Sequence, residues 1–137
     1  ILSDSNKDLA QHVVGKDGNI FITGNILNTA LELRELIKKN LSKDLGISVI
    51  KSIKPLPANN LKEIFNNSGI FVSIEENTLL GGLGSSILEF LNDNQINKDL
   101  FRFGTPDKFV SAGNTKECTL ETKIDSKSIF DSLKNKI

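Results

Sequence analysis

A chain of 137 residues has the length of one compact domain, and its 38% hydrophobic and 25% charged residues are ordinary for a globular protein. Seventeen basic side chains balance seventeen acidic ones and the pI is about 6.8, which argues against a basic face for the backbone of a nucleic acid. The single cysteine, Cys118, excludes an internal disulfide, and no apolar run approaches the roughly 20 residues that span a bilayer.

These exclusions predict a cytoplasmic domain with no nucleic-acid partner and no membrane partner. The sequence also contains no methionine, even at its first position, although a natural reading frame starts with one. We therefore expect residues 1–137 to form a single domain that has been excised from a longer chain.

The first half of the chain has the pattern of a strand–helix–strand unit. Residues 12–14 are a candidate short strand, and the apolar run at 19–23 predicts a buried one. An amphipathic helix follows, because apolar side chains return every three or four positions, at Ile26, Ala30, Leu33, Ile37 and Leu41. We expect Asn25 to cap this helix, Gly46 to end it, and residues 47–50 to form the next strand.

The second half repeats this alternation. A short helix around residues 61–65 precedes the run at 70–74, which is the clearest strand in the sequence. A glycine-rich turn opens another helix, residues 100–103 form a further strand, and Asp125 or Ser126 caps a terminal helix. The inward positions of these two helices are predicted to be Leu83, Ile87, Leu88 and Leu91, and then Ile129, Phe130, Leu133 and Ile137.

Strands that alternate with helices predict a mostly parallel sheet, because each crossover helix must cover one face of it. The fold class is therefore α/β, with three layers in the order α/β/α. No linker divides the chain. In open sheets of this kind, ligands bind beyond the carboxyl ends of the strands, so any site is expected at that edge.

Residues with catalytic potential are few. His12 is the only histidine and has no cysteine or acidic cluster near it, and Cys118 has no histidine partner. Glu75 and Glu76 are adjacent, so in an extended strand they point to opposite faces and do not form an acid–base pair. One of them can instead cap the nearby helix or bridge to a partner chain. Ser85 lacks the Gly-x-Ser-x-Gly context of a nucleophile, and no residues have metal-ligand spacing. We predict no catalytic, cofactor-binding or metal-binding residue.

The glycine-rich segment at residues 81–84 has two interpretations. Backbone N–H groups at a helix N-terminus can hold an anion, which suggests a free-standing module that binds a phosphorylated metabolite. The dinucleotide fingerprint, however, needs a third glycine where Ile87 stands, and no lysine follows as it does in a phosphate-binding loop. We therefore favour the other interpretation, in which the glycines allow a tight turn and close packing of the helix.

Four segments, taken in order, resemble the transketolase C-terminal domain family. Residues 70–77 and 81–85 resemble its strand followed by Glu-Glu-Asn/His and Gly-Gly-x-Gly-Ser, and residues 103–109 resemble its Gly-x-Pro-Asp-x-Phe segment. Further upstream, residues 23–32 are similar to its first strand–helix turn. Residues 52–56 resemble its Ile-Lys-Pro-Leu-Asp stretch, with Pro57 where Asp is usual. The most similar members are 1-deoxy-D-xylulose-5-phosphate synthases and the split bacterial transketolases.

This resemblance implies a five-stranded sheet with an antiparallel first strand, and a parent enzyme that depends on thiamine diphosphate and Mg²⁺. It implies that the cofactor lies between two other domains, while this third domain supplies no catalytic residue and helps a homodimer to form. The expected partners are therefore the other domains of the same enzyme and a second subunit. The predicted interdomain or subunit interface consists of Glu75, Glu76, Asn77, Gly81, Gly82 and Gly84. The parent reaction, whether ketol transfer, deoxyxylulose phosphate synthesis for isoprenoids or oxidative decarboxylation, stays open.

Overall fold

The computed structural model describes residues 9–23, 26–51, 56–67, 69–78, 82–105 and 125–137. Strands and helices alternate along most of this length, as the periodicity of the sequence predicts. In chain order they are β1 (Leu9–Val13), β2 (Gly18–Ile22), α1 (Leu27–Leu41), β3 (Gly46–Ile50), α2 (Ala58–Phe65), β4 (Ile70–Thr78), α3 (Leu83–Asp93), β5 (Phe101–Thr105) and α5 (Ser126–Leu133).

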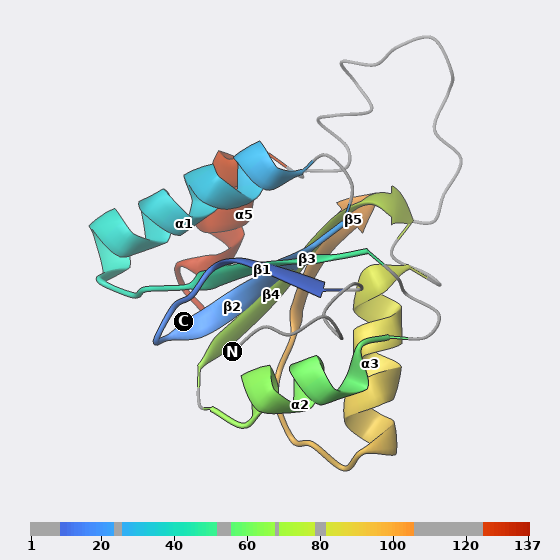
Figure 1. Ribbon diagram of the computed structural model, residues 1–137. Coiled ribbons are helices and arrows are strands. Elements are labelled where there is room, and N and C mark those ends of the chain that lie inside the picture. The colour runs from blue at the N-terminus through green and yellow to red at the C-terminus, as the bar shows by residue number, and fades with distance from the viewer. Residues whose placement is uncertain (1–8, 24–25, 52–55, 68, 79–81, 106–124) are drawn as a thin grey trace, which may run out of the picture.

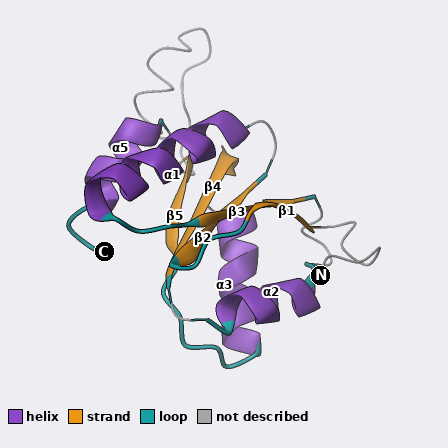
Figure 2. Cartoon of the chain, turned by 60° about the vertical axis from the view of Figure 1, so that its left-hand side comes forward, coloured by secondary structure: helices purple, strands orange, loops and turns teal. Residues whose placement is uncertain are grey.

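The five strands form one sheet in the order β1-β3-β2-β4-β5. β1 runs antiparallel to β3, and all the other neighbours are parallel. Helices α1 and α5 cover one face of the sheet, whereas α2 and α3 cover the other (Figures 1 and 2). This arrangement confirms the three-layer α/β/α fold with an antiparallel first strand.

Each face of the sheet has its own hydrophobic core, because successive side chains of a strand point to opposite faces. In β2, Ile20 and Ile22 pack under α1 and α5, while Phe21 packs under α2 and α3. On the second face, the ring centroid of Phe65 lies 5.3 Å from that of Phe21 and 4.6 Å from that of Phe71. These three rings anchor α2 to the centre of the sheet.

The end of α1 differs from the prediction that Gly46 stops the helix. The helix ends at Leu41, and Ser42 follows with a left-handed backbone, φ 56°, while its N–H donates to the carbonyl of Lys38. Gly46 is instead the first residue of β3, where a Cβ atom would lie 2.7 Å from the carbonyl oxygen of Val13. The glycine is needed for this close approach of two strands. Asn25, the predicted cap, lies outside the described residues.

Three further boundaries or faces differ from expectation. β1 begins at Leu9 and ends before Val14, which is 79% exposed. β4 continues past residue 74 to Thr78, so the two adjacent glutamates lie within the strand. Leu88, predicted to face inward, is 37% exposed, because Ile87 and Leu91 already fill the buried stripe of α3.

Within the described residues, no helix is both long and apolar enough to cross a membrane.

Candidate functional site

The carboxyl end of β4 and the amino end of α3 meet at a buried carboxylate. Glu75 is 1% exposed, and its two carboxylate oxygens accept hydrogen bonds from the backbone N–H groups of Leu83, at 2.7 Å, and Gly84, at 2.8 Å. The first N–H groups of a helix lack partners within the helix, and its N-terminus carries partial positive charge. The Glu75 carboxylate accepts hydrogen bonds from two of these N–H groups and places a negative charge at the positive end of the helix. Glu75 is therefore a cap for α3, which is one of the two roles that the sequence left open.

Glu76 has the opposite orientation, as the strand alternation predicts. It is exposed, whereas Glu75 is buried. Gly82 and Gly84, from the same predicted interface, are buried. Asn77 continues β4, but its side chain is not among those described, and Gly81 lies outside the described residues. Of the side chains in the predicted interface that are described, Glu76 is the one that reaches the surface. The contact of this edge with a neighbouring domain stays a prediction.

Gly84 lets the start of α3 lie close to β4 and β5. A Cβ atom there would lie 2.6 Å from Cδ of Arg102 and 2.9 Å from Oγ of Ser73. These distances are shorter than ordinary packing allows, so a side chain at this position would force Arg102 and Ser73 to shift. Arg102 also donates from Nη1 to Oγ of Ser85, at 3.1 Å, and so ties β5 to the first turn of α3.

The same geometry separates the two interpretations of the glycine-rich segment. An anion at the N-terminus of α3 would need the N–H groups of Leu83 and Gly84, which already bind the Glu75 carboxylate. A phosphate would have to displace this buried acid and would be repelled by it. The close approach at Gly84, by contrast, is what the packing interpretation requires. The observations therefore favour tight packing over phosphate binding.

The remaining candidates assemble no active site in the part of the chain that the structure describes. His12 lies exposed on β1, an edge strand of the sheet, and Cys118 is outside the described residues. No three of the described His, Cys, Asp and Glu side chains are grouped so that they could hold a metal ion. Sequence reasoning missed Ser73 and Arg102, because only the pairing of β4 with β5 brings them under Gly84.

Comparison with known proteins identifies the domain. The family model described as "Transketolase, C-terminal domain" matches residues 9–129, which include all five strands. The chain belongs to the transketolase C-terminal domain family.

Curated relatives within this family include several synthases. The chain is 31% identical over 114 residues to the 1-deoxy-D-xylulose-5-phosphate synthase of Caldanaerobacter subterraneus, a match that covers 83% of this chain and 18% of the synthase. It is 30% identical over 138 residues to the synthase of Blochmanniella pennsylvanica, covering 96% of this chain and 21% of that protein. The chain thus spans about a fifth of the length of these relatives.

Solved structures share the fold of this transketolase C-terminal domain. A split-gene transketolase, described as an inactive beta4 tetramer, superposes with a TM-score of 0.81 at 21% identity, covering 98% of this chain and 43% of that one. Transketolase from Campylobacter jejuni gives a TM-score of 0.69 at 11% identity, covering 99% of this chain and 20% of that one. At these identities the likeness establishes the fold alone.

Proposed function

We propose that this chain is the third, assembly-forming domain of a cytoplasmic thiamine-diphosphate-dependent enzyme of the 1-deoxy-D-xylulose-5-phosphate synthase or transketolase class, and is not catalytic by itself. The observation that carries the proposal is the role of Glu75. This buried acid at the expected site is bonded to the N-terminus of α3, so it supports the fold and is not presented to a substrate. The match to about a fifth of each synthase agrees, since most of such an enzyme lies elsewhere.

In this proposal the other domains hold thiamine diphosphate and Mg²⁺, and a homodimer forms from two such chains. The split-gene transketolase that shares the fold is described as an inactive tetramer of its beta chain, which supports an assembling but inactive domain. The synthase relatives support deoxyxylulose phosphate formation, for isoprenoid synthesis, as the parent reaction. Ketol transfer as the parent reaction is supported only by the fold that the chain shares with transketolase structures.

The carboxyl edge of the sheet is the surface that we propose packs against the neighbouring domain or subunit. Glu76 is exposed at this edge, near the end of the long strand β4. Reversal of its charge places a cation where the partner surface is adapted to an anion. Because like charges across an interface oppose association, assembly weakens while the fold is retained.

The test compares Glu76→Arg with Glu89→Arg in the complete polypeptide that carries this chain. Glu89 is a matched control, because it is also exposed but lies on the outer side of α3. We expect Glu76→Arg to shift the dimer–monomer equilibrium by about ten-fold, measured by light scattering after size exclusion, and Glu89→Arg to leave it unchanged. Equal dimer fractions for both variants and the parent protein would contradict the assigned interface.

A further inference from the structure

A groove of about 770 Å³ lies between helices α1 and α5. The two helices are side by side over one face of the sheet (Figures 1 and 2). Their inward side chains, such as Leu33 and Ile129, are fully buried in the core, so the groove opens away from the sheet. Its apolar lining consists of Leu31 and Leu36 of α1 and Phe130 of α5, which are half-buried and therefore keep apolar surface in contact with solvent.

Charged side chains border this apolar strip on both helices. Helix α1 contributes Glu32, Glu35 and Lys39, and α5 contributes Lys127 and Asp131, all of them exposed. An apolar centre with a charged and polar rim is the usual anatomy of a contact between proteins. Because this rim carries both signs of charge, the groove does not favour a partner with an excess of one sign, such as a nucleic acid or an anionic membrane.

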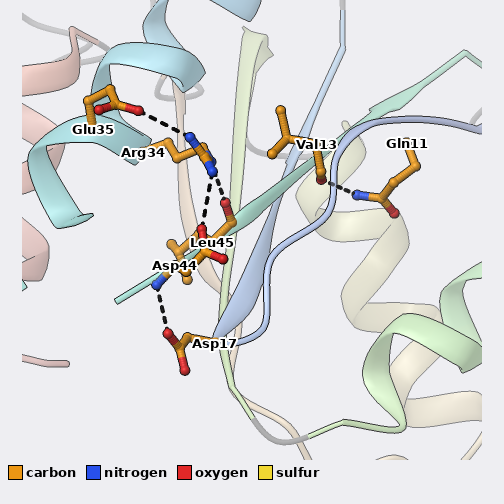
Figure 3. Close-up of polar contacts among 7 residues, drawn as sticks. All are labelled: Gln11, Val13, Asp17, Arg34, Glu35, Asp44 and Leu45. Carbon is orange, nitrogen blue, oxygen red and sulfur yellow. Dashed lines mark hydrogen bonds and ion pairs between the residues drawn. The ribbon is translucent and has the colours of Figure 1, made fainter. Parts of the chain in front are cut away.

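The charges on α1 differ in whether the chain itself neutralises them. Glu35 pairs with Nη1 of Arg34 at 3.1 Å (Figure 3). Glu32 and Lys39, by contrast, form no ion pair within the part of the chain that the structure describes. Glu32 accepts a hydrogen bond from the hydroxyl of Ser126, at 2.9 Å, which leaves its negative charge in place. Glu32 and Lys39 are therefore the charges of α1 that a docked partner would neutralise.

Helix α1 presents these two groups from a fixed position. Nε of Arg34 donates to the carbonyl of Leu45 at 2.9 Å, and Nη2 pairs with Asp44 at 3.1 Å (Figure 3). The N–H of Asp44 donates in turn to Oδ2 of Asp17 at 2.7 Å. These bonds tie the helix to the start of β3 and to the turn before β2. A surface that is held in place before binding loses little conformational entropy when a partner docks.

The positions of Glu32 and Lys39 make α1 complementary to a second copy of itself. They are seven residues apart, which is two helical turns or about 10 Å, so they lie on the same side of the helix, and Leu36 lies between them along the groove. When two such helices pack antiparallel about a two-fold axis, the acid of each copy lies opposite the lysine of the other. The same rotation brings Leu36 of both copies to the centre of the contact. A partner that carries one sign of charge would match only one of the two ends.

We propose that the groove between α1 and α5 is a self-pairing surface on which a second copy of this chain docks. The two α1 helices are antiparallel, and each Glu32 lies against Lys39 of the other copy. Association removes the apolar strip of Leu31, Leu36 and Phe130 from water, which drives the contact, while the two charge pairs fix its register. This surface is separate from the carboxyl edge of the sheet and does not rest on the contact proposed there.

The test is sedimentation equilibrium of the complete polypeptide that carries this chain, over a range of protein concentrations. Glu32→Lys and Lys39→Glu each place like charges opposite one another at both ends of the contact. We therefore expect either variant to raise the dissociation constant of self-association about ten-fold. Glu89→Lys on α3 and Lys62→Glu on α2 make the same charge changes at exposed positions outside the groove, so they should leave it unchanged. Melting temperatures confirm that all four variants fold.

The double variant, Glu32→Lys with Lys39→Glu, separates a second copy from any other partner. It exchanges the charges at the two ends of α1, so opposite charges meet again in the two-fold contact, and the dissociation constant should return to within about two-fold of the parent value. With a different partner, the exchange would leave both ends mismatched. Self-association that is absent, that is unchanged in both single variants, or that is not restored in the double variant would overturn the proposal. Glu76→Arg at the carboxyl edge is not rescued by this exchange, so failure of one contact is distinguishable from failure of the other.

Discussion

Ser73 and Glu75 lie two residues apart on the same face of β4, but their polar atoms differ in their surroundings. Both side chains are buried, at 0% and 1% exposure. Glu75 accepts two backbone hydrogen bonds from α3, whereas Oγ of Ser73 has no hydrogen-bond partner among the described residues. A buried polar atom stabilises a fold only when it is paired, so these two residues should respond oppositely to truncation.

Replacement of Glu75 by alanine should destabilise the protein, because it removes two hydrogen bonds to a charged acceptor and leaves buried N–H groups unpaired. We expect the free energy of unfolding to fall by about 3 kcal/mol, measured by urea denaturation. Glu76→Ala is the matched control, since it removes an adjacent exposed carboxylate and should cost about 0.5 kcal/mol. Equal losses for the two variants would show that Glu75 does not cap α3.

Replacement of Ser73 by alanine should raise stability, because the variant no longer buries an unpaired hydroxyl. We expect a gain of about 1 kcal/mol in the free energy of unfolding. Ser48 is the control: both serines lie opposite Phe21 in the sheet and both are fully buried, but Ser48 accepts a hydrogen bond from Asn19. Ser48→Ala should therefore lose about 1 kcal/mol. A loss of similar size for Ser73→Ala would contradict the assignment.

The position of helix α3 on the sheet depends on close contacts at its first turn as well as on its hydrophobic stripe. The stripe, which includes Leu83, Ile87 and Leu91, was predictable from periodicity and is buried. The depth at which the helix sits depends on Gly84, which lets it approach Ser73 and Arg102. The sequence alone does not show this, because the three residues are adjacent only after β4 and β5 have paired.

Replacement of Gly84 by valine should push α3 away from the sheet. The new side chain would overlap Ser73 and Arg102, and overpacking of this kind costs about 1–3 kcal/mol. Urea denaturation measures the loss. Glu89→Val places the same β-branched residue on the exposed side of α3, so its smaller effect measures the change in helix propensity. If the two variants lose equal stability, close packing at Gly84 is not what the glycine provides.

Helix α5 carries a cap that responds to pH. The N–H and hydroxyl of Ser128 donate to the Asp125 carboxylate, at 2.9 and 2.8 Å, and these bonds lower the pKa of Asp125 below its ordinary value. A carboxyl group whose pKa is lower in the folded state adds stability above its unfolded pKa. That contribution is lost as the pH falls through the folded pKa.

The stability difference between the parent protein and Asp125→Ala should therefore be constant near neutral pH and shrink in acid, below the ordinary range of aspartate. At neutral pH we expect about 0.5 kcal/mol, the lower end for a helix cap, because the group is largely exposed. Asp125→Asn is the control, since asparagine also caps helices but does not titrate there. Urea denaturation at a series of pH values measures the difference. A difference that does not change with pH would contradict the role of this carboxylate.

Strands and helices with a clear apolar period could be predicted from the sequence, whereas the structure of polar segments could not. The run at 70–74 predicted β4, but the strand continues through Glu75 and Glu76, whose charges are typical of a loop. Gly46 looked like a helix stop, because its contact with β1 comes from residues far away in the sequence. The sequence offered the capping role of Glu75 as one of two options. The prediction that Glu75 and Glu76 point to opposite faces of the strand was confirmed.

At the scale of the whole molecule, two surface regions lie on different parts of the fold. The carboxyl ends of the strands carry Glu76 and the start of α3, which we assign to assembly. Helices α1 and α5 carry the groove between them. The sequence pointed only to the first region, because the groove joins residues near 35 with residues near 130, and only the packing of α5 beside α1 brings them together.

We propose that this domain works as part of a larger thiamine-diphosphate enzyme. The most direct measurement is the mass of the native polypeptide in extracts of the source cells, detected with an antibody against this domain. We expect a band far above 15.0 kDa that co-purifies with thiamine diphosphate and forms a dimer. A band near 15.0 kDa that purifies without other chains and without the cofactor would contradict this proposal.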